Sequence, residues 1–374
     1  MNFETLAIQS TQFHDANASA VVPPLYLSTT FEREPDGSMP HGHIYTRASN
    51  PNRNALEKAY AALEGGQIGL AFASGQAATT TLFQCLLPGD HVIIPDDAYY
   101  GTPALLQEVL SLWGLQFSKV DMSDLAAVDN AFRPNTKMVW IETPSNPLLK
   151  ITNIKAVAAL ARAQGAYSAC DNTWATPVLQ RPLDLGCDVS MHSATKYFGG
   201  HSDLLSGALI FRDNGPLAEK ARQIQALGGA VPSPFDCWLL LRGIKTLALR
   251  VRQQSENAAK IAKFLSTQPQ LEAVHYPFLE SHAGFKVAQS QMASGGAMLS
   301  VQVKGGAEEA LAVKSRVKVF IRATSLGGVE SLIEHRATAE GVHSVSPKNL
   351  LRISVGLEHS DDLIADLAQA LGSY

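Results

Sequence analysis

Residues 191–197 read Met-His-Ser-Ala-Thr-Lys-Tyr and place Lys196 among small hydroxyl side chains, directly after a short apolar run. Upstream, Asp171 stands at the end of another apolar run, in Cys-Asp-Asn-Thr-Trp. A lysine that can form a Schiff base and an acid that can face a pyridine nitrogen are the protein groups that a pyridoxal phosphate (PLP) site requires. A lone Ser-x-Thr-Lys is more often an exposed loop lysine, so this hypothesis depends on the rest of the chain.

The order of apolar patterns supports the hypothesis. Strand-like runs alternate with helical patterns up to about residue 210, which predicts a mostly parallel sheet with helices on both faces. Ligands of such sheets bind at the carboxyl ends of the strands. Suitable polar or glycine-containing segments follow five predicted strand ends, namely Ser74-Gly75, Tyr99, Asn146, Asp171 and residues 193–196. Five such ends favour one shared ligand site.

Each of these segments has an ordinary alternative. Ser74-Gly75-Gln76 before a predicted helix could hold a phosphate on free backbone N–H groups, although many strand-to-helix turns look alike. Tyr99 could lie against a flat cofactor ring or be a half-buried tyrosine. Tyr45 and Arg47, in a Tyr-x-Arg pair, could grip a phosphate or belong to a solvated arm.

The length of 374 residues predicts about two domains. Residues 1–50 are rich in turn formers and are predicted to form an extended arm, residues 51–245 an α/β domain and residues 246–374 a smaller α+β domain. A long helix is expected from Leu239 to about Ser266, and one strand of the smaller domain over residues 319–323.

Composition excludes several classes of function. The net charge is −4 and no basic block is present, which argues against nucleic-acid binding. The first residues have no signal-peptide pattern and no apolar run of about 18 residues occurs, so we expect no membrane segment. The four cysteines are scattered and the eleven histidines dispersed, so we expect no metal site and a reducing, cytoplasmic location.

The segments at the five predicted strand ends, together with Tyr45 and Arg47, resemble the Cys/Met-metabolism family of PLP enzymes. This family includes cystathionine γ-synthases, cystathionine β- and γ-lyases and methionine γ-lyases. The likeness runs nearly the whole chain. Its motifs stand in family order at residues 45–47, 74–77, 142–147, 171–175, 193–197, 325–328 and 352–358. The resemblance implies an α/β, aspartate-aminotransferase-like fold (PLP fold type I), with a mostly parallel sheet, a smaller C-terminal α+β domain and an extended N-terminal arm.

The resemblance also implies the roles of the site residues. Lys196 would carry the cofactor and move protons on the substrate, Asp171 would keep the pyridine nitrogen protonated, and Tyr99 would stack on the ring and act in proton transfer. The remaining cofactor contacts would come from Gly75, Gln76, Ser193 and Thr195 at the phosphate, Asn146 at the ring hydroxyl, and Tyr45 and Arg47 of a neighbouring subunit. The substrate contacts would be those of Asn146, Ser325 and Arg352, with the arginine on the α-carboxylate. The implied assembly is a homo-oligomer, a dimer of dimers.

Several positions depart from the family pattern. Directly before Ser-Leu-Gly-Gly, γ-synthases and γ-lyases carry an acidic residue and bacterial β-lyases a tyrosine; this chain has Thr324 there and matches neither. An arginine common in the γ-enzymes is replaced by Ala104. This chain has Ile44 where γ-synthases carry an acidic residue, and Gly101 where methionine γ-lyase typically has a cysteine. The Trp174-Ala175 pair is similar to β-lyases. These substitutions could mark a changed substrate or be neutral.

We therefore expect a PLP-dependent trans-sulfuration enzyme that acts on the C–S bond of a small sulfur amino acid. The favoured reaction is β-elimination from cystathionine, giving pyruvate, ammonia and homocysteine. The alternatives are γ-replacement of an acylated homoserine by cysteine, as in cystathionine γ-synthase, and a cystathionine or methionine γ-lyase.

Two other classes of protein fit less well. A nucleotide-binding oxidoreductase needs Gly-x-Gly-x-x-Gly after its first strand, and residues 74–78 lack it. A non-catalytic PLP carrier would not need Arg352, because it has no substrate carboxylate to bind.

Overall fold

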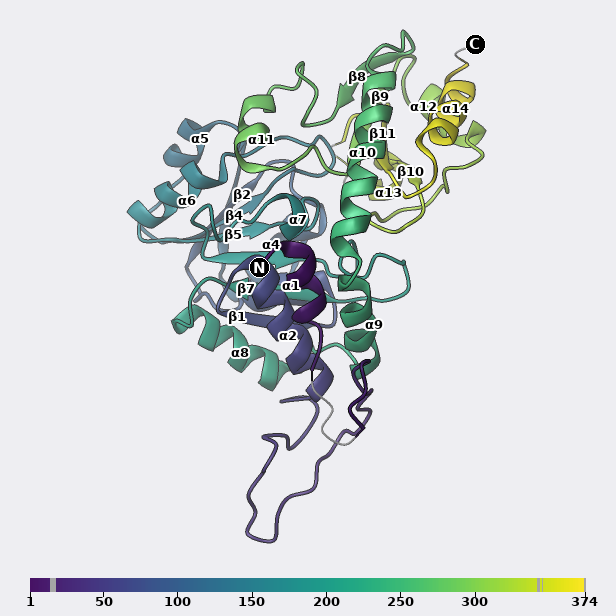
Figure 1. The fold of residues 1–374 in the computed structure, drawn as a ribbon. Coiled ribbons are helices and arrows are strands. Elements are labelled where there is room, and N and C mark those ends of the chain that lie inside the picture. Colours follow the sequence, from purple (N-terminus) through teal and green to yellow (C-terminus); the bar gives the residue numbers. More distant parts are fainter. Residues whose placement is uncertain (14–17, 342–343, 345, 373–374) are drawn as a thin grey trace.

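The computed structural model describes residues 1–13, 18–341, 344 and 346–372. Its larger part is built on a seven-stranded sheet (Figure 1). In spatial order the strands are β1 (Ile68–Phe72), β7 (Gly207–Phe211), β6 (Val189–His192), β5 (Tyr167–Asp171), β4 (Thr136–Glu142), β2 (His91–Pro95) and β3 (Gln116–Val120). Only β7 runs antiparallel to its neighbours, so the predicted mostly parallel sheet is confirmed.

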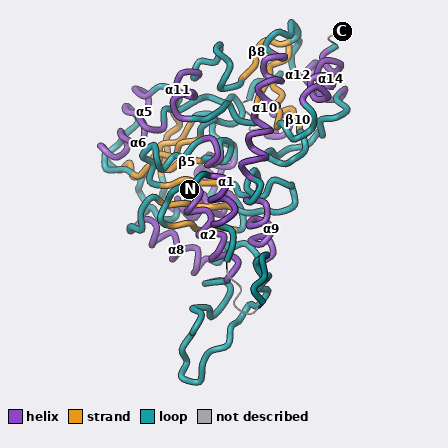
Figure 2. Tube along the Cα trace, viewed as in Figure 1, coloured by secondary structure: helices purple, strands orange, loops and turns teal. Residues whose placement is uncertain are grey.

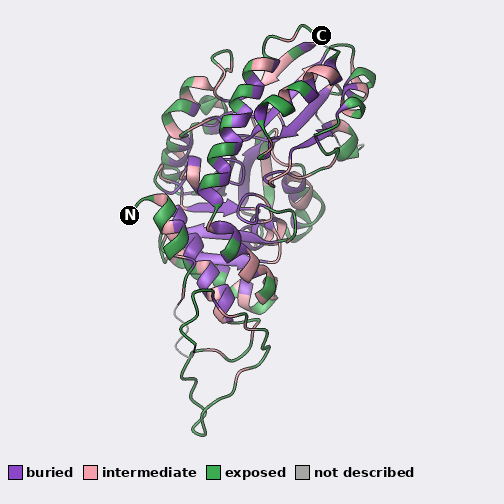
Figure 3. Cartoon of the chain, turned by 45° about the vertical axis from the view of Figure 1, so that its right-hand side comes forward, coloured by how far each residue is buried: buried purple, intermediate pink, exposed green. Residues whose placement is uncertain are grey.

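Helices cover both faces of this sheet because successive strand residues point to opposite sides. On β4, Met138 and Trp140 pack into one apolar cluster, and Val139 and Ile141 pack into another. The first face is covered by α3 (Gly75–Phe83), α4 (Gly101–Glu108) and α8 (Pro216–Gly228). The second is covered by α2 (Pro51–Glu64), α5 (Leu125–Asn130), α6 (Ile154–Ala163) and α7 (Thr176–Leu179). The strands are accordingly buried, except for the edge strand β3, and the outer helices are half-exposed (Figure 3).

The C-terminal part contains an antiparallel four-stranded sheet. Its order is β10 (Leu332–His335), β11 (Leu350–Ser354), β9 (Met298–Val303) and β8 (Leu271–His275). The helices in this part of the chain are α10 (Leu247–Leu265), α11 (Phe285–Gln291), α12 (Ala307–Arg316), α13 (Arg336–Glu340) and α14 (Ser360–Leu371). Residues of α10, α12 and α14 share one apolar cluster with this sheet.

The strand expected over residues 319–323 is wrong. Ile321 makes only an isolated bridge with Leu332. The carboxylate of Asp366 accepts the backbone N–H groups of Lys318, Val319 and Phe320 at 2.8, 2.7 and 3.1 Å. These donors are therefore satisfied by a side chain instead of a neighbouring strand.

The long helix expected from Leu239 to Ser266 is two helices, α9 (Pro234–Ile244) and α10. The backbone leaves the helical region at Thr246, with φ −110° and ψ 7°. The guanidinium of Arg250 stabilises the break, because its Nη2 donates to the carbonyl of Gly243 at 2.8 Å and its Nε to the Thr246 hydroxyl at 3.1 Å.

The N-terminal segment is only partly the extended arm that the sequence predicts. Residues 3–9 form a helix, α1 (Phe3–Gln9), that contacts α2 and α10. From residue 18 to α2 the chain forms a long loop that projects from the body (Figures 1 and 2), and residues 14–17 of the expected arm lie outside the described residues. The division of the chain into an arm and two domains, with boundaries at residues 50 and 245, stays a prediction. In the described part of the chain, no helix combines the length and apolar character needed to cross a membrane.

Candidate active site

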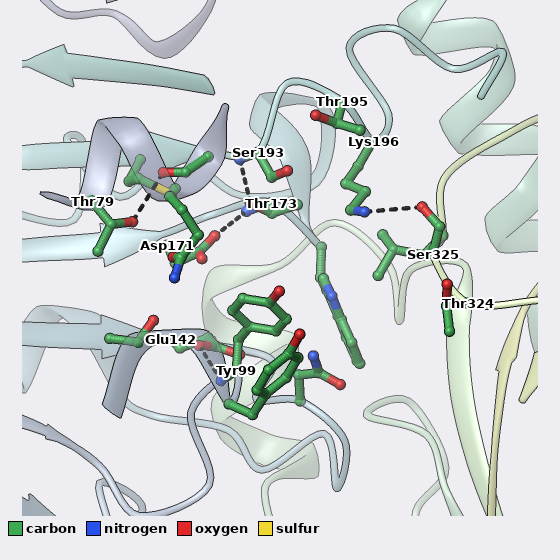
Figure 4. Close-up of a pocket in the computed structure, with 18 of the residues that line it drawn as sticks. Thr79, Tyr99, Glu142, Asp171, Thr173, Ser193, Thr195, Lys196, Thr324 and Ser325 are labelled. Carbon is green, nitrogen blue, oxygen red and sulfur yellow. Dashed lines mark hydrogen bonds between the residues drawn. The ribbon is translucent and has the colours of Figure 1, made fainter. Parts of the chain in front are cut away.

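The carboxyl ends of the parallel strands open into a cavity of about 330 Å³ (Figure 4). All five predicted strand-end segments contribute to its wall, and β11 with the loop before β10 closes the other side. The predicted site residues that line it are Gly75, Gln76, Tyr99, Asn146, Asp171, Ser193, Thr195, Lys196, Ser325 and Arg352. Residues distant in sequence are thus assembled into one site.

Lys196 extends into this cavity from the turn after β6. Its Nζ donates to the Ser325 hydroxyl at 2.9 Å (Figure 4). Burial and, to a smaller extent, the positive charge of Arg352 together lower the pKa of the Lys196 amine to about 8. The amine is therefore partly neutral near physiological pH, which lets it act as a nucleophile or a base. Ser325 has a positive φ of 89°, a strained backbone conformation of the kind that gathers at functional sites.

Two buried carboxyl groups face the cavity from neighbouring strand ends. Glu142 and Asp171 are register partners at the ends of β4 and β5. Burial raises the pKa of both, and the Asp171 charge raises that of Glu142 further. Asp171 Oδ1 accepts the Thr173 N–H at 3.0 Å, and Glu142 Oε2 accepts the Tyr99 N–H at 2.8 Å. A cationic ring nitrogen beside Asp171 would stabilise its carboxylate.

Tyr99 lies in the wall of the same cavity, and its backbone N–H is the donor to Glu142 described above (Figure 4). Burial raises the pKa of its phenol to about 12, so the hydroxyl keeps its proton near neutral pH. Its ring centre is 4.8 Å from that of Tyr100, at an interplanar angle of 60°. The two aromatic rings provide an apolar surface for a flat ligand.

The predicted phosphate end is formed by the start of α3 and the turn after β6. The Ser74 hydroxyl caps α3 by accepting the Ala77 N–H at 3.0 Å. A Cβ atom added at Gly75 would lie 3.0 Å from Ser193 Cβ, so a side chain there would narrow the space between the two segments.

The hydroxyl of Thr195 is already engaged in this structure. It donates to the Ser206 carbonyl at 3.0 Å and accepts the Ser206 N–H at 2.9 Å. It therefore keeps no proton for a phosphate unless the bond to the carbonyl opens. Similarly, the Gln76 side chain donates to the Gly101 carbonyl at 2.9 Å, which fits the prediction that Gln76 acts through its backbone.

Arg352 on β11 is buried and held from several sides. Its Nη1 donates to Asn146 Oδ1 at 3.0 Å, and its Cζ is 5.9 Å from the centre of the Trp174 ring. It also forms an ion pair with Glu334, its cross-strand partner on β10. The planar guanidinium therefore has a fixed orientation, which suits binding of a carboxylate.

Tyr45 and Arg47 are not part of this cavity. Both are exposed on the projecting loop, where Arg47 Nη1 donates to the carbonyl of Ala226. The sequence-based expectation placed them in the site of a neighbouring subunit, and their position leaves that expectation a prediction.

Three charged residues of the site were not predicted from the sequence as functional. Glu142, Glu334 and Arg336 adjoin the cavity or the arginine within it. Glu142 could have been found, because it ends a predicted strand next to the one that ends at Asp171. The other two depend on the register between β10 and β11, which the sequence does not reveal. Among the described residues no group of His, Cys, Asp or Glu could hold a metal ion.

The donor set of the cavity fits PLP. A partly neutral lysine can bond an aldehyde, a buried carboxylate can face a pyridine nitrogen, and a capped helix start with a glycine leaves space for a phosphate. Each group comes from a different strand end, as the sequence predicts.

Comparisons with known proteins agree with this reading. The family model described as Cys/Met metabolism PLP-dependent enzyme matches residues 4–372. The cystathionine gamma-synthase of Mycobacterium tuberculosis is 46% identical over 98% of this chain and 96% of its own length. The cystathionine beta-lyase of Coxiella burnetii is 42% identical over 99% and 98%.

A solved structure agrees with the fold as well. The crystal structure of metB from Corynebacterium glutamicum has a TM-score of 0.97 and 43% identity, covering 100% of this chain and 98% of that one. The chain therefore belongs to the PLP-dependent enzymes of cysteine and methionine metabolism and is a PLP-dependent trans-sulfuration enzyme.

Proposed function

We propose that this enzyme catalyses β-elimination from L-cystathionine or a related thioether, giving pyruvate, ammonia and a thiol. The observation that carries the proposal is Thr324, which lies in the cavity wall next to Ser325. The γ-enzymes that the sequence resembles have an acidic residue there, and this chain offers only a neutral hydroxyl. Lys196 is the one lysine that lines the cavity among the described residues, and β-elimination needs one base for one carbon-bound proton.

The cofactor would be held by the residues described above. Lys196 would bond it covalently, Asp171 would face its ring nitrogen, Tyr99 would pack against its ring, and Asn146 would donate to its ring hydroxyl. The backbone of Gly75 and Gln76 and the side chain of Ser193 would hold its phosphate. When bound, PLP supplies an electron sink that stabilises negative charge at the substrate α-carbon.

The chain's own groups would then perform the proton transfers. Arg352, oriented by Asn146, would bind the substrate α-carboxylate and so place the α-hydrogen near Lys196. The Lys196 amine, with a pKa of about 8, would remove that proton, and its ammonium form could return a proton to the departing sulfur. The Cβ–S bond breaks with its electron pair on sulfur. Water releases the remaining three-carbon unit as pyruvate and ammonia.

A second candidate is γ-replacement, as in a cystathionine γ-synthase. The 46% identity to the mycobacterial relative of that name favours it. Lys196 would then have to move protons at two carbons, because a γ-leaving group departs only after charge also develops at Cβ. A cystathionine or methionine γ-lyase would require the same second step.

We also propose that the active enzyme is at least a dimer. Tyr45 and Arg47 stand exposed on a projecting loop and could reach the phosphate of a neighbouring subunit. A Tyr45→Phe, Arg47→Ala variant should keep its α-helical content but lose affinity for PLP.

The test is the 2-oxo acid that purified enzyme releases from L-cystathionine, with Lys196→Ala as the inactive control. Pyruvate with homocysteine supports the proposal. 2-Oxobutyrate with cysteine contradicts the proposal and indicates that γ-elimination proceeds although position 324 holds a threonine and not an acidic residue. If no oxo acid is released, formation of cystathionine from cysteine and an acylated homoserine would instead identify a γ-synthase.

A further inference from the structure

A second buried arginine lies in the wall of the active-site cavity. Arg336 is the first residue of α13 and is only 4% exposed. It lines the cavity together with Ala339, which lies one helical turn later on the same face. The small side chain of Ala339 leaves space beside the guanidinium.

The carboxylate oxygens near Arg336 are unequally used as hydrogen-bond acceptors and ion-pair partners. A single oxygen of Glu334, Oε1, accepts from Arg336 Nη1 at 3.0 Å and also pairs with Arg352. The other oxygen, Oε2, has no donor among the described residues. One carboxylate oxygen thus serves two guanidinium groups. Arg336 Nε lies 2.9 Å from Glu340 Oε1, while the second oxygen of Glu340 accepts two serine hydroxyls.

One end of the Arg336 guanidinium remains unsatisfied. Its Nη2 is buried and has no hydrogen-bond acceptor in the described part of the chain, and its Nε is ion-paired with Glu340 without forming a hydrogen bond. The Tyr100 ring, also in the cavity wall, has its centre 5.9 Å from Arg336 Cζ. Buried polar groups without partners are rare, and an arginine that lacks an acceptor is suited to a carboxylate.

We propose that Arg336 binds a carboxylate at the far end of the substrate, while Arg352 binds the α-carboxylate. The inference rests on the proposed β-elimination and assigns its substrate class: L-cysteine thioethers whose sulfur arm ends in a carboxylate. Such an arm would extend from the reacting carbon towards α13. Uncharged thioethers of equal length would be poorer substrates, because they leave Arg336 Nη2 without an acceptor.

The competing interpretation is that Arg336 only neutralises Glu334 and Glu340. In that case its removal would weaken packing around β10 and α13 without changing the choice between a charged and an uncharged substrate arm. The preference for a charged over an uncharged substrate arm, and not activity alone, therefore separates the two interpretations.

The experiment compares S-(2-carboxyethyl)-L-cysteine with its uncharged amide, S-(2-carbamoylethyl)-L-cysteine. Dissociation constants are measured on holoenzyme from the cofactor absorbance, and kcat/KM from pyruvate release. The proteins are wild type, Arg336→Gln and Arg336→Lys. L-Alanine, which has no distal arm, reports whether the α-carboxylate site is intact.

We expect wild type to prefer the carboxylate roughly tenfold or more, the usual effect of one charge-assisted hydrogen bond. Arg336→Gln should abolish the preference and leave L-alanine binding unchanged, and Arg336→Lys should retain part of it. Equal preferences in wild type and Arg336→Gln would overturn the inference. So would a loss of L-alanine binding in Arg336→Gln, because Arg336 would then act by positioning Arg352.

Failure of the proposed reaction has a different signature. If neither thioether yields pyruvate, β-elimination is wrong, and the two dissociation constants still test Arg336. Should Arg336→Gln not fold, the charge-preserving Arg336→Lys must weaken the preference for the carboxylate over the amide, and an unchanged ratio would refute the role.

Discussion

Replacing Lys196 by methionine should stabilise the cofactor-free protein near neutral pH. Burial and Arg352 lower the pKa of the Lys196 amine from 10.5 to about 8. Each pH unit of such a difference corresponds to about 1.4 kcal/mol, so the charged amine costs the folded state about 3 kcal/mol at pH 7. Methionine removes this cost but also the hydrogen bond to Ser325, worth about 1 kcal/mol. The expected net gain is about 2 kcal/mol.

The stability gain of Lys196→Met over wild type should decrease as the pH rises. Between pH 8 and 10.5 the unfolded chain keeps a proton on Lys196 that the folded chain has released, so wild type becomes more stable as the pH rises. Below pH 8 both states are protonated and the full cost remains. The advantage of the variant should therefore shrink by about 2 kcal/mol between pH 7 and 9.5.

The assay is urea unfolding of cofactor-free wild type and Lys196→Met at equal protein concentration, at pH 7 and 9.5. Lys263→Met, an exposed lysine on α10, is the matched control. An advantage that is the same at both pH values, or a variant less stable than wild type at pH 7, would refute the electrostatic reasoning.

Three further substitutions test other parts of the account. Glu64→Gln should lower the free energy of unfolding by about 1–3 kcal/mol, because the buried Glu64 carboxylate accepts hydrogen bonds from Asn172 and Ser190; no measurable loss in urea titrations would contradict this. Gly207→Ala should weaken PLP binding, because the added Cβ would lie 2.1 Å from the Ser74 carbonyl oxygen and displace the turn before α3. Equilibrium dialysis measures the affinity, and an unchanged value would argue against a phosphate site at the start of α3. Asp171→Asn should lower kcat about a hundredfold or more with PLP still bound, since the charge facing the ring nitrogen is lost; full activity would exclude that role.

The sequence predicted the central sheet and most of the active site for a common reason. Apolar runs mark the strands, and the carboxyl ends of parallel strands meet at one edge. The segments at Gly75, Tyr99, Asn146, Asp171 and Lys196 therefore had to lie close together, and the structure places them around one cavity.

The features that the sequence did not predict depend on contacts between distant segments. The carboxylate of Asp366 takes the backbone donors that a strand over residues 319–323 would have used. The pairing of Glu334 with Arg352 follows from the β10–β11 register, and the position of Arg336 follows from the helix that begins after β10. Local patterns carry no information about such contacts.

The most direct test of the account is the identity of the lysine that carries the cofactor. Purified holoenzyme is reduced with borohydride, digested and examined by mass spectrometry for the phosphopyridoxyl group. The label is expected on the peptide that contains Lys196, and on no peptide of Lys196→Ala. A label on another lysine of the wild-type enzyme, or none at all, would contradict the central assignment.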